Sequence, residues 1–200
     1  MSHDLAKYQG LIFDMDGTLL DTMPAHLDAW QEAANHFQFP FDRTWIHGLG
    51  GMPSIKIVDE INRKYDQSLS AQAVSDFKAD AFIRMEIVPA RIECTNHILE
   101  QNLGQKKLAV GTGSQRDNAL RLLEQAGLLD KLQAVVSATD VEHHKPSPDT
   151  FLLAAEKIGV APEACVVFED TELGKQAAHR AGMDCFMVVD EELVFHPVKA

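Results

Sequence analysis

The sequence LIFDMDGT at residues 11–18 joins a short apolar run to two aspartates and a Gly-Thr pair. An uninterrupted apolar run of this length is typical of a strand that is buried on both faces, as in a parallel sheet. Asp14 and Asp16 follow the run at once, so they fall where such a strand ends. The stretch therefore predicts the first strand of an α/β domain, with carboxylates at its carboxyl end.

The same apolar pattern returns in the later part of the chain, and helical patterns separate the runs. The apolar runs are residues 108–110, 134–136, 165–168 and 185–189, and the helical patterns are 92–103, 116–126, 148–158 and 171–181. Alternating strands and helices indicate βαβ units, whose right-handed crossovers build a parallel sheet. We therefore predict a Rossmann-like α/β core domain formed by residues 1–23 and 92–200, in which 190–200 form a loop or short terminal element.

Residues 24–91 break this alternation. They contain helical patterns at 24–37, 54–65 and 70–87, and they show no clear strand. The connections at 48–53 and 88–89 are rich in glycine and proline, as turns are. We predict that residues 24–91 form a small all-helical cap domain, inserted after the first strand of the core.

The composition is that of an acidic globular chain. Of 200 residues, 46% are hydrophobic and 24% are charged, which is an ordinary mixture for a folded protein. Lys and Arg number 18 and Asp and Glu number 30, so the formal net charge is −12. This balance argues against nucleic acid and against an anionic membrane surface as partners, because both attract basic faces.

The cysteines and the N-terminus indicate a cellular compartment. Cys94, Cys165 and Cys185 are far apart and form no CxxC pair, so their pattern is typical of reduced thiols. The N-terminus lacks the basic and apolar segments of an export signal, and no apolar run approaches the roughly 18 residues of a membrane span. We expect a cytoplasmic protein that acts as a monomer on a small molecule.

Polar side chains follow four of the predicted strands. In an open parallel sheet, ligands bind beyond the carboxyl ends of the strands. The residues at these ends are Asp14, Asp16, Thr112, Gly113, Ser114, Lys145, Glu169 and Asp170. Because four separate strand ends supply carboxylate, hydroxyl and ammonium groups, we expect these side chains to converge on one site.

Two aspartates at positions 14 and 16 suit phosphoryl chemistry. Neighbouring carboxylates repel each other unless a cation or a proton compensates, and hard oxygen ligands favour Mg²⁺. A carboxylate can attack phosphorus to give an aspartyl-phosphate. A second carboxylate can protonate the leaving alkoxide and later activate water. The alternative is a plain turn, since Asp and Gly are common turn residues.

The other strand ends suit phosphate and metal binding. The GTGS segment at residues 111–114 offers backbone N–H groups and a hydroxyl to a phosphate, or forms an ordinary turn. Lys145 is placed to neutralise the transferring phosphoryl group, or is a solvated loop lysine. Asp170 either caps a helix or completes a metal shell begun by Asp14 and the backbone carbonyl of Asp16. Glu169 is expected at or just outside that shell.

The sequence resembles the haloacid dehalogenase superfamily of phosphotransferases, whose four motifs it matches in chain order. The matching segments are DMDGT at 14–18, GTGS at 111–114, KP at 145–146 and ED at 169–170. The insertion resembles the small cap of the β-phosphoglucomutase-like branch, in which His26 and Trp30 match branch positions. The run VEHHKPSPDTFLL at 141–153 is similar to bacterial fructose-1-phosphate phosphatases. The resemblance covers nearly the whole chain.

The resemblance implies a role for each site residue. Asp14 is implied as the nucleophile and Asp16 as the general acid and base, while Thr112 and Lys145 hold the transferring phosphoryl group. The residues implied to organise Mg²⁺ are Asp14, Asp16, Glu169 and Asp170. The residues expected to contact the substrate are Thr18, His26, Lys78, Gly113 and Ser114.

These observations favour a Mg²⁺-dependent phosphatase that hydrolyses small sugar phosphates such as fructose 1-phosphate. The alternative is a β-phosphoglucomutase that interconverts β-glucose 1-phosphate and glucose 6-phosphate. The cap of that mutase carries an arginine for the second phosphate of a bisphosphate, and the corresponding stretch here, residues 50–54, has none. A dehalogenase would leave Asp16 idle, because a halide leaves without a proton. A non-catalytic binding module or a receiver-like domain fits poorly with four intact strand ends and a cap.

Overall fold

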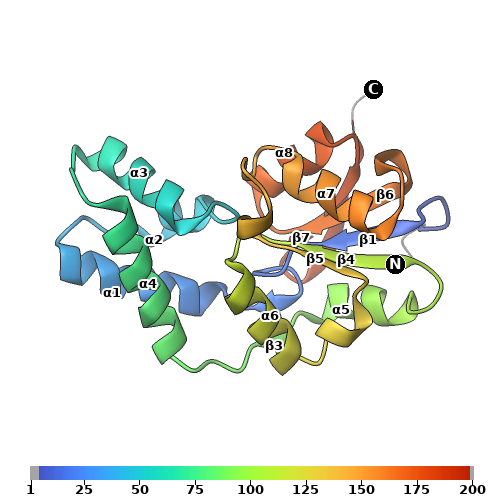
Figure 1. The fold of residues 1–200 in the computed structure, drawn as a ribbon, viewed down its shortest axis with the longest axis horizontal. Helices are drawn as coiled ribbons and strands as arrows, with labels where there is room; N and C mark the ends of the chain where they lie inside the picture. The colour runs from blue at the N-terminus through green and yellow to red at the C-terminus, as the bar shows by residue number, and fades with distance from the viewer. Residues whose placement is uncertain (1–4, 199–200) are drawn as a thin grey trace.

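The computed structural model describes residues 5–198 and has two parts, an α/β part and a helical part (Figure 1). The α/β part is built on one sheet of order β5-β4-β1-β6-β7-β8. The strands are β1 (Gly10–Phe13), β4 (Lys107–Gly111), β5 (Ala134–Val136), β6 (Cys165–Glu169), β7 (Asp184–Val189) and β8 (Glu192–His196). Neighbouring strands run parallel from β5 to β7, which confirms the predicted Rossmann-like sheet.

Helices cover both faces of this sheet. They are α5 (Glu93–Gln101), α6 (Arg116–Gln125), α7 (Asp149–Ile158) and α8 (Glu172–Arg180), with short 3-10 turns η1 (Leu129–Lys131), η2 (Ala138–Asp140) and η3 (Pro162–Ala164). Figure 1 shows α5 and α6 on one side of the sheet and α7 and α8 on the other. Side chains alternate between the faces of a strand, so Leu11 and Phe13 pack in one apolar core and Ile12 in the other.

The helical part follows β1 and has a core of its own. Its helices are α1 (Met23–Phe37), α2 (Arg43–Gly48), α3 (Ser54–Tyr65) and α4 (Ala71–Arg84). Leu27, Trp30 and Ile61 are among the buried residues that fill the space between them. This arrangement confirms a helical cap inserted after the first strand. We retain residues 24–91 as the proposed limits of the cap domain, although α1 begins at Met23.

The two chain segments that join the parts pair with each other. The strands β2 (Leu20–Asp21) and β3 (Ala90–Arg91) form an antiparallel ladder outside the main sheet. The sequence analysis did not predict these strands, because two residues are too few for a readable pattern. Their pairing places the entry and the exit of the cap side by side.

The carboxyl-terminal segment, expected to be a loop or short terminal element, contains a short strand. Residues 192–196 form β8, which pairs antiparallel with β7 at the edge of the otherwise parallel sheet. The tight turn between them uses Asp190 and Glu191 at φ values of 49° and 61°. Hairpin turns with positive φ normally contain a glycine, as in Asn-Gly or Asp-Gly, so a turn formed by Asp190 and Glu191 carries only a weak signal in the sequence. Among residues 5–198, none of the helices has both the length and the apolar character that crossing a bilayer requires.

Candidate active site

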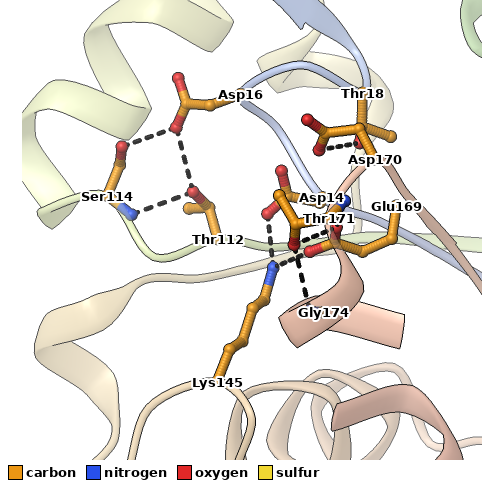
Figure 2. A network of polar contacts seen from close by, with 10 residues as sticks. All are labelled: Asp14, Asp16, Thr18, Thr112, Ser114, Lys145, Glu169, Asp170, Thr171 and Gly174. Carbon is orange, nitrogen blue, oxygen red and sulfur yellow. Dashed lines mark hydrogen bonds and ion pairs between the residues drawn. The ribbon is translucent and has the colours of Figure 1, made fainter. Parts of the chain in front are cut away.

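The central strands β4, β1 and β6 end at the same level, and this register assembles the site. Phe13 pairs with Val110 on one side and with Phe168 on the other. Asp14 therefore leaves β1 between the ends of its two neighbours, close to Thr112 and Glu169. Figure 2 shows the predicted strand-end residues converging, as the parallel topology leads one to expect.

Lys145 lies at the centre of this network. Its Nζ donates to Asp14 Oδ1 at 2.5 Å and to Glu169 Oε1 at 2.7 Å. The Lys145 side chain is 1% exposed, so it is a buried ammonium and not the solvated lysine of the alternative interpretation. Burial alone would lower its pKa, but the two carboxylates stabilise the charge and raise the pKa above its usual range. The site thus contains a fixed positive charge next to Asp14.

Asp14, Glu169 and Asp170 form an acidic cluster in which one oxygen of each lies within 4.8 Å of the others. Burial, and then the neighbouring carboxylates, raise the pKa of Asp14 well above its ordinary value despite Lys145. Burial and Glu169 raise the pKa of Asp170 to about 8. The raised pKa values mean that the negative charges of these crowded carboxylates are not fully balanced by nearby positive charge. Carboxylate oxygens arranged in this way suit a hard divalent cation. The residues therefore fit the Mg²⁺ that the sequence predicts.

Glu169 is held on both of its carboxylate oxygens. One accepts from Lys145, and the other accepts from the backbone N–H of Thr171 at 2.6 Å and from its hydroxyl at 2.8 Å. Thr171 also accepts from the Gly174 N–H at 3.1 Å and so caps α8. A Cβ on Gly174 would overlap the Glu169 carboxylate, so this position requires glycine. The helix cap is therefore Thr171 and not Asp170, which corrects the alternative interpretation of Asp170.

Thr18 occupies a different place from the one expected. The sequence analysis expects it to contact the substrate, but its side chain is fully buried and is absent from the lining of the cavity. Its hydroxyl donates to Asp170 Oδ1 at 3.1 Å. Thr18 therefore orients one carboxylate of the acidic cluster.

The carboxylate of Asp16 points away from the acidic cluster (Figure 2). It accepts from the hydroxyl of Thr22 at 2.6 Å, from that of Ser114 at 2.7 Å, and more weakly from Thr112 at 3.4 Å. Burial alone would raise the pKa of Asp16, but the neighbouring His26 and the hydroxyls favour the charged form and hold the pKa below its usual range. The two aspartates therefore have opposite surroundings, although only one residue separates them.

A cap lysine reaches Asp16 through a histidine. Lys78 Nζ lies 2.7 Å from His26 Nδ1, and His26 Nε2 lies 3.1 Å from Asp16 Oδ1. An ammonium group can only donate, so His26 Nδ1 accepts and its Nε2–H donates to Asp16. The imidazole stacks on Phe82 with ring centroids 4.0 Å apart, which fixes its plane. Burial and Lys78 lower the pKa of His26, and burial lowers the pKa of Lys78 to about 8 although Asp16 opposes this.

The cap closes over these residues and leaves a cavity between the two parts. Asp14, Asp16, Thr112 and Ser114 line it from the core, and cap residues including Trp30 and Lys78 line it from above. The loop after α2 rests directly on the core. Its Gly51 carbonyl lies so close to Gly113 that a Cβ on Gly113 would overlap it. The two glycines allow the cap loop to touch the segment at residues 111–114 directly.

Sequence reasoning missed three residues that hold the predicted ones in place. Thr22 orients Asp16, Thr171 orients Glu169, and Gly174 provides room for that glutamate. A threonine directly after the ED pair of β6 is a helix-capping signal that sequence reasoning can use. Thr22 has no such signal, because its partner is fixed only by the path of the chain after β2.

The fold and the site together indicate which protein family the chain belongs to. The sequence profile of the haloacid dehalogenase-like hydrolases matches residues 11–188. The chain belongs to this family, as its four motifs indicated, and it is a hydrolase.

The chain is also similar to individual proteins and solved structures. The chain is 42% identical over 178 residues to fructose-1-phosphate phosphatase YqaB of Escherichia coli, covering 89% of this chain and 95% of that protein. It is 30% identical over 182 residues to the β-phosphoglucomutase of Bacillus subtilis, covering 88% of this chain and 80% of the other. Among solved structures, a hydrolase from Pseudomonas syringae matches with a TM-score of 0.84 at 28% identity, over 92% of this chain and 85% of that one.

Proposed function

We propose that this protein is a Mg²⁺-dependent phosphatase that hydrolyses small sugar phosphates, such as fructose 1-phosphate, through an aspartyl-phosphate on Asp14. The observation that carries this proposal is the opposite environment of the two aspartates. Asp14 lies 2.5 Å from the buried ammonium of Lys145, whereas Asp16 lies in a cradle of hydroxyls and an imidazole. The 42% identity to a protein named fructose-1-phosphate phosphatase supports the choice of substrate.

Binding of the phosphate group uses the core residues. Lys145 supplies positive charge, and Thr112, Gly113 and Ser114 supply hydroxyl and N–H donors at the end of β4. Asp14 and Asp170, with Glu169 beside them and the backbone carbonyl of Asp16, would hold Mg²⁺. When bound, the ion offsets the repulsion between these carboxylates and the phosphate dianion.

The first step forms a bond between an Asp14 carboxylate oxygen and phosphorus and breaks the bond between phosphorus and the sugar oxygen. Asp16 gives its proton to the leaving alkoxide, so a neutral sugar departs. The free site favours ionised Asp16. The incoming phosphate dianion raises the pKa of Asp16, because a nearby like charge favours the protonated form.

The second step returns the enzyme to its starting state. Ionised Asp16 takes a proton from water, and the resulting hydroxide attacks the phosphorus of the aspartyl-phosphate. The acyl phosphate bond breaks, Asp14 is regenerated and inorganic phosphate leaves. Asp16 then releases its proton to solvent, because the dianion that favoured its protonated form has gone. Lys78 and His26 hold the Asp16 carboxylate in place for both proton transfers.

The charges of the cap favour hydrolysis over a mutase reaction. The arginines of the cap helices pair with carboxylates at the surface: Arg43 with Asp28, Arg63 with Glu60, and Arg84 with Glu32. Among the described residues that line the cavity, Lys78 is the one cationic side chain that comes from the cap. A mutase must hold a second phosphate there, whereas a phosphatase needs only one phosphate site and access for water.

We also place this activity in the cytoplasm, because Cys94, Cys165 and Cys185 are unpaired thiols in the structure. We also propose that the protein acts as a monomer, since hydrogen bonds within one chain already hold the Asp14 and Asp16 carboxylates.

The experiment that tests the function is a substrate panel. The protein is incubated with Mg²⁺ and a set of phosphorylated sugars that includes fructose 1-phosphate, and released phosphate is measured. β-Glucose 1-phosphate with a trace of its 1,6-bisphosphate is a separate sample. Free phosphate from the panel is expected. Glucose 6-phosphate as the main product of the separate sample would show a mutase and contradict the proposal.

A further inference from the structure

A second chamber adjoins the catalytic cavity on the side of α4 and the beginning of α6. It has a volume of about 190 Å³ and shares His26, Ser54, Lys78, Gly113 and Ser114 with the first cavity. Because these residues line both spaces, the chamber lies where the sugar of a bound sugar phosphate would extend beyond the phosphate group. We call this space the outer chamber.

The outer chamber has an apolar wall formed by Ala79, Phe82 and Ile83, and four neutral hydrogen-bonding side chains lie around it. Ser54 and Ser75 come from the cap, and Gln115 and Asn118 come from the core. Both serines are half-buried, and their hydroxyls form no hydrogen bond with any residue between 5 and 198. The Asn118 amide oxygen already accepts from Arg121 at 2.7 Å, so the amide keeps its N–H donors for a ligand. Hydroxyl groups can both donate and accept, so the two serines match the hydroxyl groups of a polyhydroxylated ligand.

The charged groups of the outer chamber are few, and they balance. Lys78 is the cation, and its ammonium already donates to His26 at 2.7 Å. Asp117 supplies a carboxylate with no ion-pair partner among the residues that the structure describes. A second phosphate in this chamber would bring two further negative charges next to Asp117, with one shared ammonium to compensate them. Coulomb repulsion would oppose such a ligand.

We propose that the outer chamber binds the hydroxylated carbon chain of the leaving group, and that Asp117 makes the enzyme select sugar monophosphates over bisphosphates. The inference rests on the proposed phosphatase function and extends it to the part of the substrate that does not react. Ser54 and Ser75 contact the sugar hydroxyls, and Asp117 excludes a distal anion.

The test compares fructose 1-phosphate with fructose 1,6-bisphosphate as substrates. The ratio of their kcat/KM values is measured for the wild type, Asp117→Asn, Asp117→Lys and the control Glu156→Lys. Glu156 is exposed on α7, on the opposite face of the sheet from α6, so its replacement changes the net charge equally without touching the chamber. We expect the wild type to prefer the monophosphate by more than tenfold. Asp117→Lys should reduce this preference by roughly tenfold, Asp117→Asn by less, and Glu156→Lys should leave it unchanged.

A wild-type ratio near one, or equal shifts in Asp117→Lys and Glu156→Lys, would overturn the inference. Binding of fructose 1-phosphate and fructose 1,6-bisphosphate to the Asp14→Asn protein with Mg²⁺ is also measured by calorimetry. This measurement distinguishes a failure of the chamber proposal from a failure of the phosphatase proposal. If Asp117 controls binding selectivity while the wild type releases no phosphate, the phosphatase proposal fails and the proposal about ligand binding in the outer chamber is supported. If both ligands bind equally and are hydrolysed, the chamber proposal fails alone. If neither ligand binds, both proposals fail.

Discussion

Replacing Lys145 by methionine removes the one cation that contacts the acidic cluster among residues 5–198. The Lys145 ammonium lies 2.5 Å from Asp14 and 2.7 Å from Glu169, and the side chain is 1% exposed. Methionine has a similar length and is apolar, so it fills the buried space, but it also loses the cation–π contact of the ammonium with the Phe151 ring, whose centroid is 4.7 Å away. Loss of charge is therefore the main consequence of the substitution.

The size of the effect follows from burial. Removing one partner of a buried ion pair costs about 3–5 kcal/mol, because the other charge remains without compensation. Protonation of Asp14, whose pKa is already raised, offsets part of this cost. Without metal we expect the free energy of unfolding to fall by about 3 kcal/mol at pH 8, and by less at pH 5. Since Lys145 is also proposed to hold the phosphoryl group, kcat/KM should fall by about 10³-fold.

Urea unfolding in a chelating buffer and steady-state hydrolysis of fructose 1-phosphate measure the two effects. Lys157→Met is the matched control, because Lys157 is 40% exposed and lies 3.9 Å from Asp140. Such surface pairs contribute about 0–1 kcal/mol. Equal loss of stability in both variants, or retention of activity within tenfold in Lys145→Met, would refute the assigned role of this ammonium.

Three further predictions concern the metal, the cap lysine and the cap contact. Since the pKa of Asp170 is raised to about 8, the folded state binds more protons than the unfolded state between about pH 4 and 8. Metal-free stability should therefore fall with pH by about 1.4 kcal/mol per unit for one proton, and saturating Mg²⁺ should reverse this slope in thermal unfolding scans. Lys78→Met should lower kcat/KM by roughly 10–100-fold, whereas Lys56→Met, exposed on α3, should not. The activity of the wild type should decline above about pH 8 as Lys78 loses its proton. A decline of the same size in Lys78→Met would show that another group titrates. Gly113→Ala should lower kcat/KM by at least tenfold because its Cβ meets the Gly51 carbonyl, and a crystal structure of this variant with the cap loop still seated on the core would contradict this reason.

The sequence predicted the central fold because its signals are local and redundant. Each inner strand is an uninterrupted apolar run that stops at polar residues, and each following helix has its own periodicity. The helix predicted over residues 54–65 has these bounds in the structure. The short terminal element was not specified as the edge strand β8, because the turn before it, at Asp190 and Glu191, contains no glycine to mark a hairpin.

The candidate site was predicted to the extent that residues stand at strand ends. The convergence of Asp14, Lys145 and Glu169 followed from parallel topology alone. Contacts made by residues away from the strand ends could not be predicted: Thr18 holds Asp170, and Lys78 reaches His26. These pairs exist only because the cap closes on the core and the chain turns back after β1, and neither event leaves a pattern in the sequence.

The most direct test of the central claim is to locate the covalent phosphoryl group. The enzyme is mixed with Mg²⁺ and fructose 1-phosphate carrying a radioactive phosphate, quenched in acid within the first turnover, digested and mapped. We predict label on the peptide that contains Asp14, with release by hydroxylamine as expected of an acyl phosphate, and no label in Asp14→Asn. Phosphate release with label on another residue, or an Asp14→Asn protein that still turns over at the wild-type rate, would contradict the account.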